Sequence, residues 1–206
     1  MMDIVVESVK KIEDLAEHSG CTDAGILLDV NPDTPICQFE QGAAMSAAFG
    51  GRSAVFTTYE PLRARTKISF MFGAPLDAPA SRGAAVAIIN AVLGFLCMSR
   101  VLHSCPVTSH TNCREELVRE LAGKRLFCIG SMGRSGSNVF SNIAKNPAEA
   151  EIILISGDGL IAEGTGDMIE TYKNEKRIIC IGPSTAGVAR LSEIEHWCPY
   201  GRSCLD

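Results

Sequence analysis

Four side chains that can bind a soft metal fall within eleven residues of this sequence. They are His103, Cys105, His110 and Cys113, in the spacing H-x-C-x4-H-x2-C. Cysteine and histidine are the ligands of structural zinc, and cysteine holds iron–sulfur clusters. The spacing matches no established template such as paired C-x-x-C motifs, and loose groups of this kind are more often incidental. The stretch therefore has two interpretations, a metal site built from these four residues or an ordinary linker.

Three apolar runs further along the chain each end in glycine and small polar residues. The runs end in Gly130-Ser131-Met132-Gly133, in Ser156-Gly157-Asp158-Gly159 and in Gly182-Pro183-Ser184-Thr185. Each run is short, rich in branched residues and without alternation, which is typical of a parallel strand buried on both faces. In such sheets, ligands bind beyond the carboxyl ends of the strands. The sequence therefore predicts one binding crevice lined by these turns and by Gly164 and Thr165.

Each turn has a ligand-binding and a structural interpretation. Gly130, Gly133 and Gly136 would let an anion approach the start of a following helix, but their spacing differs from the G-x-G-x-x-G dinucleotide fingerprint. Asp158 stands where an acidic residue can bind ribose hydroxyls, and a turn-forming aspartate between glycines explains it equally well. The Gly182 turn offers amides and two hydroxyls to a polar ligand, or begins a helix. Asn90, inside an apolar helix, needs a partner: a neighbouring loop by preference, or a ligand.

The elements that would position these residues divide into two kinds. Helix periodicity and turn signals predict an early helix followed by several strands, which indicates an antiparallel sheet, and then a fully apolar buried helix. A capped helix and three parallel strands follow, with a further strand near the C-terminus. The expected ranges are 3–18, 114–122 and 84–98 for helices, and 24–30, 37–40, 43–49, 53–59, 125–129, 151–155, 177–181 and 196–198 for strands. This pattern predicts an α/β chain with an α+β domain over 1–112 and a Rossmann-like parallel-sheet domain over 113–206.

Composition narrows the class of protein. The net charge of −5 and the isoelectric point near 5.4 argue against a broad nucleic-acid or anionic-membrane surface. The apolar stretch 84–98 is shorter than the roughly 18 residues needed to span a bilayer. Nine cysteines, an odd number with several inside apolar segments, favour a reducing cytoplasm over a disulfide framework, and the N-terminus lacks the order of a signal peptide. No catalytic signature is present, so the chain is not assigned as an enzyme.

Motifs in both halves resemble a known family. The segment I-S-G-D-G-L-I-A-E-G-T at 155–165 and the turn I-G-P-S-T at 181–185 resemble the DUF364 family, also called the heavy-metal chelation domain, whose members show TG-x-x-L-x-N-G-T followed by GPST. The helix S-R-G-A-A-V-A-I-I-N-A at 81–91 looks like its N-terminal region, DUF4213. The resemblance implies an enolase-N-terminal-like α+β domain packed on a Rossmann-like domain, a pocket between them, and a role in binding or handling a metal or metal chelate.

Two functions follow as expectations. The first is a cytoplasmic protein that binds a small ligand or metal chelate in an inter-domain cleft, in metal or cofactor metabolism, with no nucleic-acid or membrane partner. The second is an enzyme, for example a transferase, that uses a nucleotide-type cofactor such as S-adenosylmethionine at the Gly130–Gly136 loop. A third interpretation makes the apolar helix 84–98 a homodimer contact, with the cleft secondary.

Overall fold

The computed structural model describes residues 2–132 and 140–204, and these form two four-stranded sheets with the strand orders β3-β2-β1-β4 and β5-β6-β7-β8. The first sheet is antiparallel and the second parallel. The strands are β1 (Gly25–Val30), β2 (Ala43–Phe49), β3 (Arg52–Thr58), β4 (Ala64–Lys67), β5 (Leu126–Ile129), β6 (Ile152–Ile155), β7 (Arg177–Ile181) and β8 (Glu195–Trp197). The helices are α1 (Ile4–Ser19), α2 (Pro79–Phe95), α3 (His110–Glu120), α5 (Gly157–Leu160), α6 (Thr165–Tyr172) and α7 (Ala186–Leu191). The α/β fold class predicted from the sequence is confirmed.

Small side chains bring α2 close to the antiparallel sheet. A Cβ atom added to Gly83 would lie 3.1 Å from the Phe56 ring of β3, so a larger residue there would force the helix away. Every residue from Gly83 to Gly94 is buried, and α2 contacts β2, β3, α1 and α7. The interpretation of this helix as a homodimer contact is therefore wrong, because its apolar surface is already covered within the chain. The helix begins at Pro79, five residues before the expected start, and the Ser81 hydroxyl donates to the Ala78 carbonyl.

The parallel sheet is covered on both faces, which explains its unbroken apolar strands. Ile153 and Ile155 pack into a core shared with α2 and α7, while Ile152 and Leu154 pack on the other face against Leu117 of α3. Successive strand residues point to opposite faces, so burial of both faces removes the alternation. The strand expected near 196–198 is present as β8.

Two local predictions differ from the structure. Residues 37–40 form a turn and not a strand, with the Glu40 amide donating to the Cys37 carbonyl, because the side chains of this segment and not a ladder hold it. Helix α3 begins at His110, four residues before the expected start, because a 3-10 turn over Val107–Ser109 leads directly into it. His110 and Cys113 are therefore helical residues. Gly133 and the helix expected to open after it lie outside the described residues.

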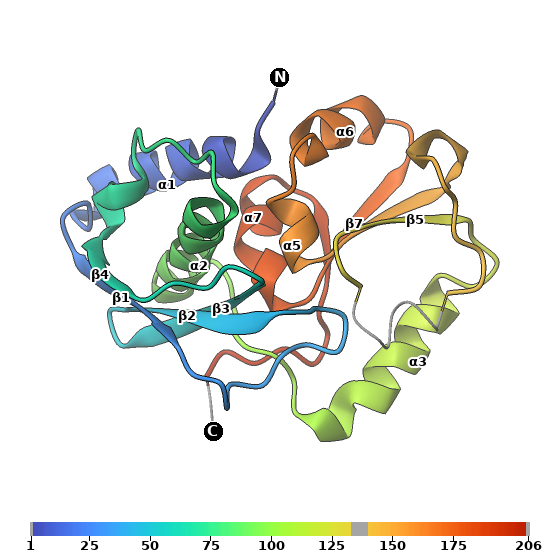
Figure 1. Ribbon diagram of the computed structural model, residues 1–206, viewed down its shortest axis with the longest axis horizontal. Helices are drawn as coiled ribbons and strands as arrows, with labels where there is room; N and C mark the ends of the chain where they lie inside the picture. The colour runs from blue at the N-terminus through green and yellow to red at the C-terminus, as the bar shows by residue number, and fades with distance from the viewer. Residues whose placement is uncertain (1, 133–139, 205–206) are drawn as a thin grey trace.

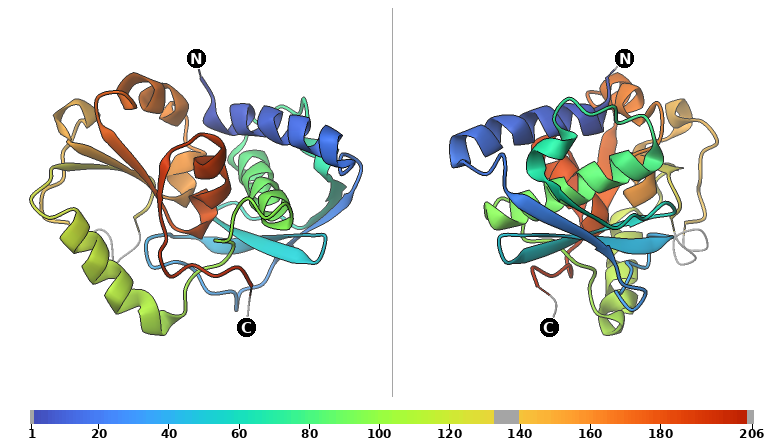
Figure 2. Two further views of the ribbon diagram at one scale, coloured as in Figure 1. Left: turned by 180° about the vertical axis from the view of Figure 1, so that it is seen from behind. Right: turned by 60° about the vertical axis from the view of Figure 1, so that its left-hand side comes forward.

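One hydrophobic core joins the two sheets. It contains residues of α1, α2 and the antiparallel sheet together with Ile153, Cys180 and Val188 from the second half. Figures 1 and 2 show α7 between α2 and the parallel sheet, with α3 on the far side of that sheet. The division into domains at residue 112 stays a prediction. Among the described helices, none is both long and apolar enough to cross a bilayer.

Candidate functional site

The turns that follow β5, β6 and β7 meet at one edge of the parallel sheet. Gly130 has φ +85°, and a Cβ atom there would lie 2.4 Å from the Gly159 amide nitrogen. A Cβ atom on Gly157 would lie 2.9 Å from the Cβ atom of Ser184. The glycines therefore allow the three turns to touch one another, which is a structural reason for their presence at these positions.

The first two turns are joined by a carboxylate of the chain itself. Both oxygens of Asp158 accept from the Ser131 amide, at 2.8 and 3.0 Å, and one accepts from the Ser131 hydroxyl at 2.6 Å. The Ser156 hydroxyl also donates to Asp158, at 3.1 Å. A phosphate at the Gly130 turn would have to displace this carboxylate from the Ser131 amide. Met132 beside it is buried in the core under α3.

Glu40, from the turn before β2, fills the space at the third turn. Its carboxylate accepts from the Thr57 hydroxyl at 2.7 Å, and from the hydroxyl and amide of Ser184 at 2.9 and 3.2 Å. It lies against Gly182, whose φ of +87° and missing side chain make room for it. Burial raises the Glu40 pKa to about 7, opposed by the Thr57 and Ser184 donors, with the charge of Asp158 raising it further.

Sequence reasoning missed Glu40. Its charge could have identified it in the sequence, because Glu40 is the only charged residue between Asp33 and Arg52. A charge within a long uncharged stretch that must fold into a core needs several donors, and here the third turn supplies them.

Asn90 ties α2 to the same turn. Its amide nitrogen donates to the carbonyls of Val55 and Ser184, at 3.2 and 3.0 Å, and its oxygen accepts from the Gly187 amide at 2.8 Å. Both amide hydrogens and the oxygen thus have protein partners. Ser184 and Thr185 are fully buried, and the Thr165 hydroxyl donates to the Gly159 carbonyl, whereas Gly164 is exposed at the start of α6.

The raised pKa of Glu40 predicts a distinctive pH dependence of stability. Because the folded-state pKa of about 7 exceeds the ordinary value of 4.5, the folded protein keeps a proton that the unfolded chain releases. This stabilisation is complete below the unfolded pKa and is lost as pH rises through the folded pKa. We expect the free energy of unfolding to fall by about 2–3 kcal/mol between about pH 5 and 8, and Glu40→Gln to remove that fall. Urea unfolding across this pH range, with exposed Glu163→Gln as control, is the measurement; parallel pH profiles for wild type and Glu40→Gln would contradict it.

The four residues of the expected metal site do not form one centre. His103 turns its Nε2 atom to the Ser53 hydroxyl at 3.3 Å, toward the antiparallel sheet. His110 lies at the first position of α3, and burial lowers its pKa. Within residues 2–132 and 140–204, no three His, Cys, Asp or Glu side chains lie close enough to hold a single metal ion.

The segments that carry Cys105 and Cys113 instead contact two distant segments, which carry Cys37 and Cys198. Hydrogen bonds hold the four segments together: the Ser104 hydroxyl donates to the Pro35 carbonyl at 2.8 Å, the Gln38 amide to the His110 carbonyl at 2.7 Å, and the Arg202 guanidinium to the Ser104 carbonyl at 3.0 Å. Cys37 and Cys113 belong to one packed cluster that Trp197 also contacts. We call Cys37, Cys105, Cys113 and Cys198 the thiol group.

Burial and nearby charge raise the pKa values of the thiol group. Burial is the main cause that raises the pKa of each thiol. Negative charge on Cys105 would further raise the pKa of Cys37, Cys113 and Cys198. Negative charge on Glu40 would have the same effect on the pKa of Cys37 and of Cys198. All nine cysteines of the chain, each within the described part, are free thiols.

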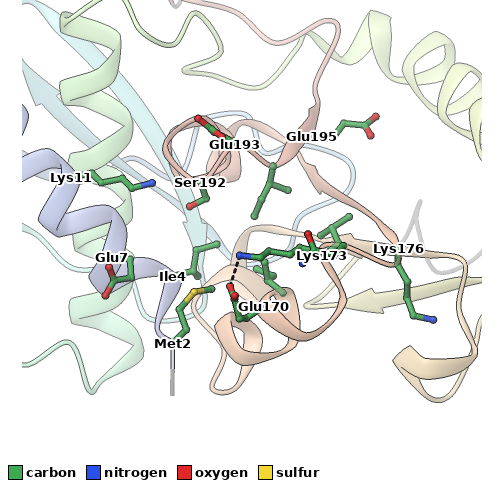
Figure 3. A pocket seen from close by; sticks show the side chains of 14 residues that line it. Met2, Ile4, Glu7, Lys11, Glu170, Lys173, Lys176, Ser192, Glu193 and Glu195 are labelled. Carbon is green, nitrogen blue, oxygen red and sulfur yellow. Dashed lines mark ion pairs between the residues drawn. The ribbon is translucent and has the colours of Figure 1, made fainter.

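Two hollows among the described residues are lined by none of the residues of the turns after β5, β6 and β7. One, of about 490 Å³, lies between α1, α6 and the end of α7, with Lys11, Lys173 and Glu193 among its lining residues (Figure 3). Its lysines are engaged: Lys11 donates to the Leu191 carbonyl and Lys173 pairs with Glu170. Of the turn residues expected to bind a ligand, Gly164 lines a second hollow of about 640 Å³ near Arg82.

Comparison with known proteins identifies the fold. No family model matches the sequence, and no curated protein matches it. A protein of unknown function from the DUF364 family of Desulfitobacterium hafniense DCB-2 is similar in structure, with 14% identity, a TM-score of 0.50 and coverage of 91% of this chain and 82% of that one. A DUF364 protein of unknown function from Pyrococcus horikoshii gives 20% identity, a TM-score of 0.48, and coverage of 88% and 79%. This chain thus shares the fold of a DUF364 protein, while the DUF4213 assignment of its N-terminal region stays a prediction.

Proposed function

We propose that this protein binds a soft-metal chelate, which brings ligands of its own, at the thiol group beside Glu40. The observation that carries the proposal is the contact between the separate segments that carry Cys37, Cys105, Cys113 and Cys198. Thiolates are the protein ligands that select soft metals, and the carboxyl edge of a parallel sheet is where α/β proteins place ligands. The expectation of a metal or chelate ligand is thus retained, with a different set of residues.

The hydrogen-bond donors at this edge are already used by carboxyl groups of the chain, which disfavours an anionic ligand. Glu40 and Asp158 both place carboxyl groups there, and Asp158 already uses the Ser131 amide that an anion would need. A nucleotide-type cofactor such as S-adenosylmethionine gains no support from this geometry, because Asp158 already occupies the Ser131 amide at the Gly130 turn. A homodimer and a cytoplasmic location stay predictions from the sequence.

The metal content of anaerobically purified protein tests the proposal. We expect about one metal centre per chain by elemental analysis, and loss of most of the metal in Cys37→Ser and Cys198→Ser. Cys21→Ser and Cys97→Ser are matched controls, since neither residue belongs to the thiol group, and they should keep the metal. Wild-type protein that stays metal-free after anaerobic incubation with the citrate complexes of zinc and iron would overturn the proposal, as would full metal content in the Cys37 and Cys198 variants.

A further inference from the structure

We infer that a small molecule with a phosphate group or a pair of carboxylate groups binds in a hollow beside the guanidinium groups of Arg52 and Arg100. The hollow has a volume of about 260 Å³. The start of β3, the end of α2, the segment after α2 and the C-terminal segment line it. It shares no residue with the thiol group, so the inference does not depend on the proposed chelate binding.

The charge of the lining favours an anion. The described residues that line the hollow include two arginines and two serines, and none of them is Asp or Glu. Within residues 2–132 and 140–204, neither the Arg52 nor the Arg100 guanidinium donates to a side chain or to a carbonyl. A guanidinium offers its N–H donors in a planar fork that fits two oxygens of a carboxylate or a phosphate. Two unpaired cations at one hollow, in a chain of net charge −5, therefore favour a site for an anion.

Two glycines hold the rim of the hollow in place. A Cβ atom on Gly94 would lie 2.7 Å from the Leu102 side chain, so the segment after α2 packs directly on the helix. A Cβ atom on Gly50, in the turn before β3, would collide with the Phe95 ring at the end of α2. These close contacts fix the start of β3, which carries Arg52, against the end of α2. The site is therefore built by tertiary packing before any ligand arrives.

Backbone hydrogen bonds bring the C-terminal segment to the same rim. The Leu102 and His103 amides donate to the Arg202 carbonyl, at 2.8 and 2.9 Å, and the Arg202 amide donates to the His103 carbonyl at 3.0 Å. Ser203 follows directly and lines the hollow, where its exposed side chain adds a hydroxyl to the guanidinium donors.

The end of α2 does not require the two arginines as a cap. The Leu93 carbonyl, near the end of this helix, already accepts from the Met98 and Ser99 amides, at 2.8 and 3.2 Å. Cations near a helix C-terminus can also balance the helix dipole, but that role leaves their N–H donors free. The donors of Arg52 and Arg100 are therefore available to a ligand.

An adjoining hollow of about 730 Å³ shares Ser99 and Arg100 but has a mixed charge. Arg190 lines it together with Glu193 and Glu195, whose carboxylates would repel an anion. We therefore assign the ligand to the smaller hollow. Its volume of about 260 Å³ is several times the roughly 30 Å³ that one water molecule occupies, so it admits an anion of a few heavy atoms.

Titration calorimetry of the full chain with inorganic phosphate and, separately, with succinate tests the inference. At low ionic strength we expect saturable binding of at least one of the two, with a dissociation constant of about 1 mM or lower. The anion that binds more tightly identifies the ligand as a phosphate or a dicarboxylate.

Substitution of the arginines should weaken this binding selectively. We expect Arg52→Gln and Arg100→Gln each to raise the dissociation constant about tenfold, and the double variant to abolish binding. Arg119→Gln removes an exposed arginine of α3 and should leave the binding unchanged. Wild-type protein that binds neither anion would overturn the inference, as would undiminished binding in the double variant.

A footprint on wild-type protein locates the ligand without any substitution. The exposed thiol of Cys97 lines the hollow, whereas Cys21 follows α1 and does not. The bound anion should slow the alkylation of Cys97 by iodoacetamide several-fold and leave the rate at Cys21 unchanged, as measured by mass spectrometry. Binding that leaves Cys97 unprotected, or that slows both thiols equally, would contradict a site at this hollow.

Discussion

Gly182→Ala is expected to destabilise the protein by about 3–5 kcal/mol, from backbone strain and overpacking together. Gly182 has φ +87° and ψ 167°, a region open almost only to glycine. A Cβ atom there would lie 2.4 Å from a Glu40 carboxylate oxygen. Glu40 cannot move aside without losing its hydrogen bonds from Thr57 and Ser184. The backbone strain and the steric clash therefore both lower the free energy of unfolding. Urea unfolding of wild type and variant measures the effect.

Gly164→Ala separates the two causes. Gly164 has φ +79°, but no atom lies within 4 Å of the Cβ position, so only the backbone term remains. We expect Gly164→Ala to lower the free energy of unfolding by about 1–2 kcal/mol. Equal losses at Gly164 and Gly182 would mean that the contact with Glu40 does not constrain the third turn.

Asn90→Leu is expected to lower the free energy of unfolding by about 3–5 kcal/mol, although leucine has a similar size and suits an apolar helix. The substitution removes the partner of two buried carbonyls, Val55 and Ser184, and of the Gly187 amide. Buried polar groups that lose their partner retain the cost of desolvation. These bonds join α2 to the turn after β7, so the two sheets should also become less cooperative in unfolding.

The matched control for Asn90 is Asn174→Leu. Asn174 is exposed after α6, so its substitution should change the free energy of unfolding by less than about 0.5 kcal/mol. A comparably small effect at Asn90 would show that water or local rearrangement replaces its three bonds.

Local pattern was sufficient to predict most of the fold. The apolar runs at β5, β6 and β7 predict a parallel sheet, because strands of such a sheet are buried on both faces. Parallel strands bring their carboxyl ends to one edge of the sheet. The meeting of the three turns follows from that topology. Asn90 was expected to tie its helix to a neighbouring loop by preference, and it does so.

The contacts of the candidate site depend on tertiary structure that no local pattern reveals. Glu40 lies 144 residues from its partner Ser184, and its own segment resembles a weak strand. Cys37 and Cys198 come from the turn before β2 and from the segment after β8, and nothing in their spacing relates them to Cys105. The Gly130 turn resembles an anion site in sequence, but the Asp158 carboxylate accepts from the Ser131 amide that an anion would need. Each of these contacts depends on how the two sheets pack together.

The most direct measurement of metal binding at the thiol group is a crystal structure of the anaerobically loaded protein with anomalous scattering at the metal edge. We predict one strong peak enclosed by the sulfurs of Cys37, Cys105, Cys113 and Cys198, beside Glu40. A peak at any other place, or four reduced thiols with no metal between them in protein soaked with iron and zinc, would contradict it.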